Sequence, residues 1–113
     1  MKRETVAELP EFIRRAKALL TEAERAELID YLSANPEAGV RLAGGVRKLR
    51  FARPGGGKSG GYRVIHFYRS GAGTPLFLMS IFAKNVQENL TPQQLAELAK
   101  AADDLIASYR RKV

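Results

Sequence analysis

The sequence predicts an α+β fold, because helix-type and strand-type patterns occupy separate parts of the chain. Apolar residues recur at helical spacing over residues 10–20 and 21–34. Three consecutive segments rich in β-branched, aromatic and aliphatic residues follow, and a last helical pattern closes the chain. Strands without intervening helices favour antiparallel pairing. We therefore expect two N-terminal helices, a small twisted antiparallel sheet and a C-terminal helix.

The ends of the helices are marked by capping signals. Pro10 suits the first turn of a helix that runs to about Leu20. Thr21 and Glu24 form a capping box for a second helix, which Asn35-Pro36 ends near Ala34. The segment Thr91-Pro92-Gln93-Gln94 repeats this signal and opens a third helix to about Arg110. Its predicted apolar stripe consists of Leu95, Leu98, Ala102, Leu105, Ile106 and Tyr109.

The three strand segments are expected at residues 46–52, 62–69 and 76–83, joined as a meander by short connections. Residues 4–8 are a candidate for a short edge strand. In the second segment both faces carry apolar groups, so either helices cover both faces or one face receives a partner. His66 stands among apolar neighbours, which favours a packed, hydrogen-bonded histidine over a catalytic one.

Length and composition limit the class of protein. A chain of 113 residues is expected to form one domain, residues 1–113. It contains no cysteine and a single histidine, so a zinc site is not expected and we predict no cofactor. No apolar run is long enough to cross a bilayer and no signal-type segment begins the chain, which favours a cytoplasmic protein with no membrane partner.

The positive charge is concentrated in the middle of the chain. The net charge is +7, and the span from Ala38 to Gln87 holds nine basic residues and no Asp or Glu. The other basic residues share their segments with all twelve acids. A surface of uncompensated positive charge favours phosphate, and nucleic-acid contact is the better interpretation than a merely solubilising face.

The triplet Gly57-Lys58-Ser59 resembles the end of a nucleotide-binding loop, but its context argues against that function. The position five before Gly57 is Ala52 instead of glycine, and the following segment is strand-type, whereas a phosphate loop must lead into a helix. The segment is better interpreted as a hairpin connection that carries Lys58 between Arg53 and Arg63.

Strand alternation groups several of the cations. If Leu49 faces the core, Lys48 and Arg50 share the opposite face, and two cations will not stay together in an apolar interior. Arg63 on the next strand and Lys84 after the third strand are predicted to converge with them on one groove. This clustering favours a site over an exposed basic strand face.

Three segments then show a resemblance to a known family. Residues 44–51 (GGVRKLRF), 57–65 (GKSGGYRVI) and 81–85 (IFAKN) occur in the order and spacing of the RelE/HigB family of type II toxins, and the chain resembles its HigB-like branch. The helix that ends at Asn35-Pro36 is similar to that branch too. The resemblance covers nearly the whole chain and implies a RelE-like fold.

The resemblance implies an endoribonuclease toxin. Such a toxin cuts mRNA in the A site of the 30S ribosomal subunit, inhibits translation, and is held inactive by a cognate antitoxin, here expected to be a HigA-like helix-turn-helix protein. The implied reaction needs no metal: the RNA 2′-hydroxyl attacks the adjacent phosphate and expels the 5′ oxygen.

Roles follow by position in the motifs. Lys48 and Arg50 match the basic pair of the central strand, with Lys48 the candidate for proton transfer, and Arg63 matches the arginine on the scissile phosphate. The expected RNA- or phosphate-binding residues are Arg47, Arg53, Lys58, Lys84 and, by stacking on a base, Phe82. Relatives often carry tyrosine at the Phe82 position, and some place one near the C-terminus. Tyr109 is a candidate substitute, although its spacing fits the core better.

The Arg63→Ala substitution is expected to abolish cleavage without unfolding the protein, on the assumption that Arg63 is a surface residue.

Two other functions remain open. A ParE-like toxin would share the fold and target gyrase, but that branch generally lacks the basic set of Lys48, Arg50 and Arg63. A non-catalytic nucleic-acid-binding module would account for the charge but not for the clustering of these three side chains.

Overall fold

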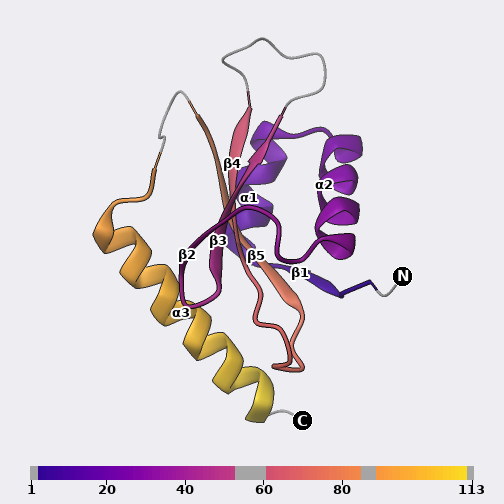
Figure 1. The fold of residues 1–113 in the computed structure, drawn as a ribbon. Coiled ribbons are helices and arrows are strands. Elements are labelled where there is room, and N and C mark those ends of the chain that lie inside the picture. Colours follow the sequence, from indigo (N-terminus) through magenta and orange to yellow (C-terminus); the bar gives the residue numbers. More distant parts are fainter. Residues whose placement is uncertain (1–2, 53–60, 85–88, 112–113) are drawn as a thin grey trace.

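The computed structural model describes residues 3–52, 61–84 and 89–111. Within these ranges the chain forms a five-stranded sheet and three helices (Figure 1). In chain order the elements are β1 (Val6–Glu8), α1 (Pro10–Leu19), α2 (Glu22–Ala34), β2 (Val40–Ala43), β3 (Val46–Phe51), β4 (Tyr62–Phe67), β5 (Leu76–Ala83) and α3 (Pro92–Arg111). The predicted α+β class and all three predicted helices are confirmed, with ends within one residue or so of those expected.

The capping signals act as the sequence predicts. The Thr21 hydroxyl accepts from the Glu24 backbone N–H at 3.1 Å, and the Glu24 carboxylate accepts from the Thr21 N–H at 2.8 Å. Thr91 and Gln94 make the same reciprocal pair at the start of α3, at 3.1 and 2.9 Å. These bonds satisfy donors that the first turn of each helix leaves open, and they fix where each helix begins.

The sheet has the order β1-β5-β4-β3-β2, with the predicted antiparallel meander β3-β4-β5 at its centre. The expectation of a purely antiparallel sheet is wrong in one respect, because the edge strand β1 pairs with β5 in parallel. Strand β2 was not expected. It pairs with β3 through the two-residue turn at Gly44 and Gly45, which both have positive φ, as tight hairpin turns require.

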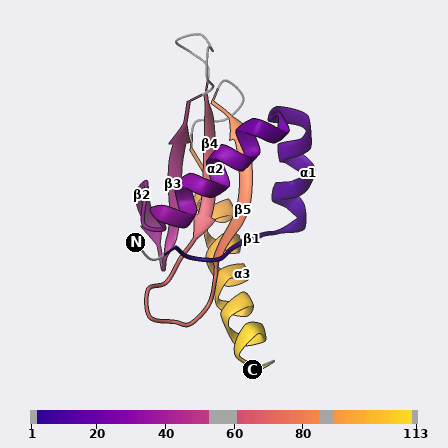
Figure 2. The same cartoon turned by 90° about the vertical axis from the view of Figure 1, so that its right-hand side faces the viewer.

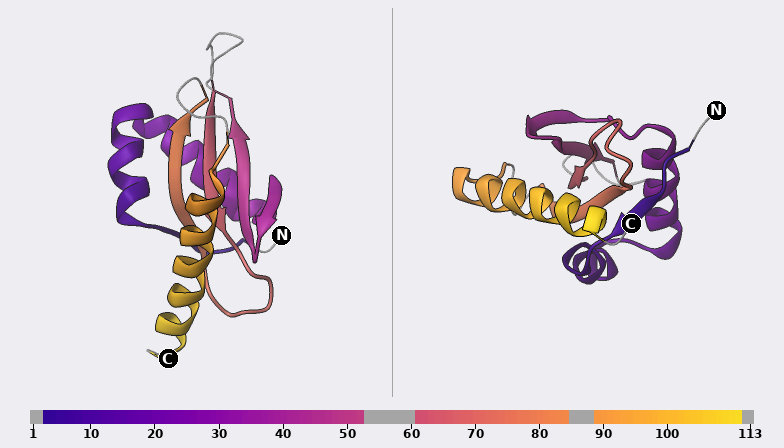
Figure 3. Two further views of the ribbon diagram at one scale, coloured as in Figure 1. Left: turned by 90° about the vertical axis from the view of Figure 1, so that its left-hand side faces the viewer. Right: turned by 90° about the horizontal axis from the view of Figure 1, so that it is seen from below.

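Helices cover both faces of the sheet, which decides between the two predicted arrangements. Figure 2 shows α2 crossing one face with α1 beside β5, and both views of Figure 3 place α3 on the opposite face. Residues of α1 and α2 pack with Leu49, Tyr62 and Val64 in one apolar cluster. Residues of α3 pack with Ile65 and Phe67 in the other. None of the helices in the described ranges is both long and apolar enough to span a membrane.

Candidate functional site

The candidate site is a row of side chains that crosses the three central strands on the face covered by α3. Arg50 of β3 lies directly opposite Arg63 of β4, and Arg63 lies directly opposite Phe82 of β5. Residues directly opposite on neighbouring antiparallel strands point to the same face, with Cβ atoms roughly 5 Å apart. Phe82 packs with α3 residues, which identifies this face as the α3 side.

Two arginines in such a position repel one another. Like charges directly opposite across a strand pair destabilise the sheet. Arg50 is exposed and forms no ion pair among the described residues, whereas Arg63 is only 3% exposed. An anion seated between the two guanidinium groups would relieve the repulsion, and the planar fork of arginine suits phosphate oxygens.

The burial of Arg63 corrects one expectation. The prediction that Arg63 is a surface residue is wrong, because it lies on the central strand, between β3 and β5, on a sheet with helices on both faces. Every residue of β4 is buried for the same reason. Replacing Arg63 by alanine therefore removes a buried charged group, and an effect on folding has to be measured together with any effect on activity.

Lys48 lies on the same face as Arg50, two residues earlier on β3. This spacing places the two residues about 7 Å apart along the strand. The Lys48 ammonium donates a hydrogen bond to the Asn89 Oδ1 at 2.5 Å. Asn89 lies just before α3, so this bond connects the basic strand to the start of the helix that covers the face. Asn89 was not predicted as a site residue, because no local pattern relates it to a residue 41 positions away.

Lys84 lies two residues after Phe82, at the end of β5. It directly follows β5, and its backbone N–H donates to the Gly61 carbonyl at 3.3 Å, two residues before Arg63. Its side chain is half-buried. The structure thus brings Lys48, Arg50, Arg63, Phe82 and Lys84 to one end of the central strands. Arg53 and Lys58 lie outside the described residues.

Arg47 lies on the other face of β3. It is opposite His66 on β4, and its side chain pairs with Glu37, at 3.6 Å to the carboxylate and 3.1 Å to the backbone carbonyl. Only 16% of the Arg47 side chain is exposed. The structure therefore does not bring Arg47 together with the other predicted site residues, as the alternation of side chains along a strand requires.

His66 is a packed core histidine, as predicted. It is fully buried, and its Nε2 lies 2.9 Å from the Ala38 carbonyl oxygen. Because a carbonyl only accepts, Nε2 donates in this hydrogen bond and carries a proton. Burial, and secondarily the positive charge of Arg47, lowers the pKa of His66 to about 4, against the opposing effect of the Ala38 hydrogen bond.

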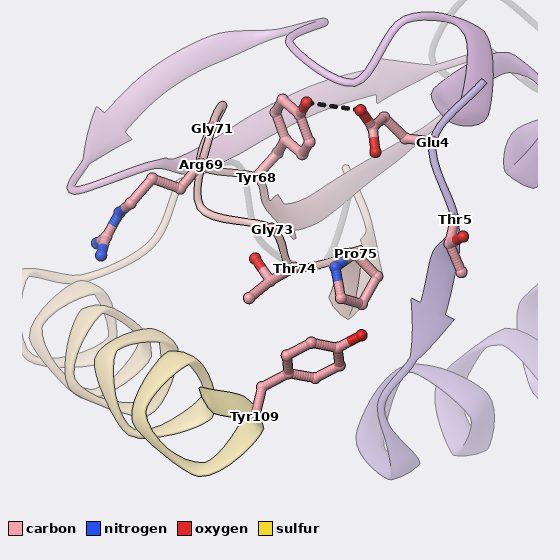
Figure 4. A pocket seen from close by; sticks show the side chains of 9 residues that line it. All are labelled: Glu4, Thr5, Tyr68, Arg69, Gly71, Gly73, Thr74, Pro75 and Tyr109. Carbon is pink, nitrogen blue, oxygen red and sulfur yellow. Dashed lines mark hydrogen bonds between the residues drawn. The ribbon is translucent and has the colours of Figure 1, made fainter. Parts of the chain in front are cut away.

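Tyr109 is neither in the core nor near the arginine row. It is 40% exposed, so the prediction that it belongs to the core is wrong. Figure 4 shows its ring facing Thr74 and Pro75 across a cavity of about 430 Å³, where the Tyr68 hydroxyl donates to Glu4 at 3.0 Å. Tyr68 follows the last residue of β4, and Arg63 is near the first. Tyr68 and Arg63 are therefore roughly 17 Å apart along the strand. Because Tyr109 lines the same cavity as Tyr68, it is not placed to take part in chemistry at Arg63.

The strand that follows the glycine-rich segment bears on the prediction about nucleotide binding. Residues 62–67 form β4 and pair with β3, so the segment connects two antiparallel strands instead of leading into a helix. A phosphate loop of the nucleotide-binding type needs the amino end of a helix at that point. The prediction against nucleotide binding at Gly57-Lys58-Ser59 is consistent with this arrangement.

Fold and site together define a small, basic α+β protein with a cationic row across a central antiparallel meander. The chain matches a family model described as the RelE toxin of the RelE/RelB toxin-antitoxin system, over residues 10–113. It therefore belongs to the RelE toxin family and is the toxin of a type II toxin-antitoxin system. As such, it pairs with an antitoxin.

Proposed function

We propose that the protein is a ribosome-dependent mRNA endonuclease of the HigB-like branch, which cleaves mRNA in the ribosomal A site without a metal ion. The observation that carries this proposal is the direct opposition of Arg50 and Arg63, with Lys48 two residues away on the same face. A sheet that retains two opposed arginines and a lysine on one face is suited to bind an anion of high charge density. Membership of the RelE family makes RNA phosphate the anion of choice.

The chemistry requires charge stabilisation and proton transfer. The 2′-hydroxyl of the RNA attacks the adjacent phosphorus, the bond to the 5′ oxygen breaks, and a 2′,3′-cyclic phosphate remains on the upstream fragment. We assign Arg50 and Arg63 to the negative charge that grows on the non-bridging oxygens. Lys48 is our candidate for proton transfer, and its hydrogen bond to Asn89 orients its side chain. Lys84, together with Arg53 and Lys58, is assigned to the flanking phosphates.

Primer extension on mRNA after brief induction tests the proposal. The native protein should cut mRNA inside translated codons, which primer extension reports as new 5′ ends of the downstream fragments. Arg50→Ala should reduce cleavage at least a hundredfold, on the scale of one lost donor to a transition-state oxyanion. Because Arg50 is exposed, this variant should stay folded. Arg14→Ala, which removes an exposed arginine from α1, is the matched control and should cleave normally.

The same experiment separates the alternatives. Intact transcripts on arrested ribosomes would contradict nuclease activity and would favour a non-catalytic RNA-binding module. Inhibition of gyrase supercoiling by purified protein, with mRNA left intact, would instead favour a ParE-like toxin. The partner is proposed to be a HigA-like helix-turn-helix antitoxin, and the sequence of the adjacent open reading frame tests that assignment.

A further inference from the structure

A second cavity adjoins the arginine row at Phe82. It has a volume of about 330 Å³ and lies between the first half of α3, the α3-facing residues of β5 and one side of α1. Ser80 lies opposite Ile65, so it shares the face of Phe82, and both residues line the cavity. Leu90 and Leu98 supply further apolar surface. A cavity of this size accommodates a small planar ring.

The charges around this cavity differ from those of the row beside it. Glu11, Arg15 and Glu97 line its rim, and Arg15 lies 3.5 Å from Glu11 in an exposed ion pair. Within the described residues the Glu97 carboxylate has no hydrogen bond or ion pair. The lining thus carries one net negative charge inside a protein of net charge +7. It would repel phosphate and accept hydrogen bonds from a neutral group that bears N–H donors.

We propose that this cavity receives a nucleobase next to the scissile phosphate, and that Glu97 selects bases with an exocyclic amino group over uracil. The proposal rests on the function proposed above. One strand spacing, roughly 5 Å, separates Arg63 from Phe82, so a strand of RNA held at Arg50 and Arg63 passes the mouth of the cavity. Proteins read single-stranded RNA by enclosing unstacked bases and bonding their polar edges.

The discrimination follows from the donors on each base. Adenine, cytosine and guanine each present an amino group that can donate to a carboxylate. Uracil presents one N–H between two carbonyl oxygens, and those oxygens would face the negative charge of Glu97. Glutamine at position 97 could donate to a carbonyl as well as accept. The Glu97→Gln variant is therefore expected to accept uracil.

The test is the base profile of cleavage at both positions that flank the cut, measured by primer extension on reporter mRNAs with all four bases at each position. We expect native protein to cut sites with uracil at one of these positions roughly tenfold less often than matched sites with an amino-bearing base, a ratio typical of one specific base contact. Glu97→Gln should bring that ratio towards one. Glu22→Gln, an exposed carboxylate change on α2, is the matched control and should keep the native ratio.

The outcomes distinguish this inference from the function on which it rests. If native protein makes no cuts in the mRNA, the proposed nuclease function fails and this assignment fails with it. If native protein cleaves and Glu97→Gln has the native base profile, only the cavity assignment is overturned. A Glu97→Gln variant that weakens antitoxin binding and leaves the base profile unchanged would overturn it too, by showing that a protein side chain occupies the cavity.

Discussion

At the scale of single residues, His66 shows how burial fixes a protonation state. Its Nε2 donates to Ala38, and its Nδ1 is buried with no hydrogen-bond partner in the described part of the chain. A second proton would place a charge beside Arg47 in a site without water access. The neutral ring is therefore part of the folded structure, and its protonation opposes folding.

This residue makes stability depend on pH. The pKa of His66 falls to about 4 on folding, from an ordinary value near 6.5 in the unfolded chain. Between these values the unfolded state binds more protons, so stability falls as the pH falls, by about 3 kcal/mol in total. Above pH 6.5 His66 is neutral in both states, so this loss of stability is absent.

Denaturant titrations between pH 7.5 and 4, compared with those of His66→Gln, isolate this contribution from that of the carboxylates. The native protein should lose stability more steeply over this range than the variant. Should the variant fold poorly, the imidazole resonance followed by NMR in native protein supplies the same answer. A ring that titrates near pH 6.5 would contradict the prediction.

Arg63 is a second residue whose environment decides how it must be tested. A buried arginine that loses its side chain leaves both a cavity and unpaired neighbours, which typically costs a few kcal/mol. We expect Arg63→Ala to be both inactive and less stable, whereas Arg50→Ala should be inactive with native stability. Thermal unfolding of the two variants beside their cleavage assays checks this. Equal melting temperatures for Arg63→Ala and the native protein would show that the guanidinium does not support the fold.

At the scale of elements, strand β2 and its tight turn position the basic strand β3. Gly39 precedes β2 with a φ of +96°, and a Cβ atom there would overlap the backbone carbonyl of Lys48. The chain thus needs glycine at this position for two separate reasons, namely the backbone conformation and the close approach to β3. Gly44, in the turn, has a φ of +56° but open space around it.

The two glycines provide a matched pair of substitutions. Gly39→Ala should destabilise the protein by about 2 to 3 kcal/mol, because strain and overlap add. Gly44→Ala should cost about 1 kcal/mol, because only the left-handed conformation is disfavoured. Urea unfolding of both variants measures the difference. Equal losses would show that β2 moves away from Lys48 freely when a methyl group is added.

The elements also show what the sequence could and could not predict. Helix ends were predictable because capping residues act locally, and the meander was predictable because its strands are consecutive and richly apolar. Strand β2 was missed because Val40–Ala43 is only four residues long and lies between glycines, with half of its residues exposed. Strands β1 and β2 lie at opposite edges of the sheet, and α1 and α2 carry the chain from one edge to the other. The parallel pairing of β1 with β5 depends on this path, which no local pattern encodes.

The same limit applies to the site. Alternation along β3 correctly predicted that Lys48 and Arg50 share one face. The same alternation places Arg47 on the other face, so the prediction that Arg47 binds phosphate beside them did not follow from the pattern. The opposition of Arg50 and Arg63 depends on strand register. The cavity lined by Ser80 and Glu97 depends on how α3 is placed over the sheet. Register and helix placement arise from packing across the whole core, so sequence periodicity does not reveal them.

At the scale of the whole molecule, charge is divided between the layers. All acids of the described chain lie on the helices or in segments outside β2–β5, whereas these four strands carry none. Two basic residues of the sheet region are neutralised by acids, since Arg47 pairs with Glu37 and Arg69 with Asp103 at 3.3 Å. The guanidinium of Arg69 also covers the Phe67 ring at 5.2 Å. Arg50 forms no ion pair within the described residues, so its charge stays available to a ligand.

This division predicts how binding depends on salt. A protein that binds single-stranded RNA by its phosphates loses affinity on a logarithmic salt scale, with a slope of about 0.7 for each phosphate neutralised. We expect RNA with a 2′-deoxy substitution at the cleavage position, which cannot be cut, to bind native protein with a slope of several times that value. Arg50→Ala should lower the slope by about 0.7, and Arg14→Ala, which removes an exposed arginine of α1, should leave it unchanged. Fluorescence anisotropy between about 50 and 200 mM salt measures both, and an unchanged slope for Arg50→Ala would mean that the arginine row does not hold a phosphate.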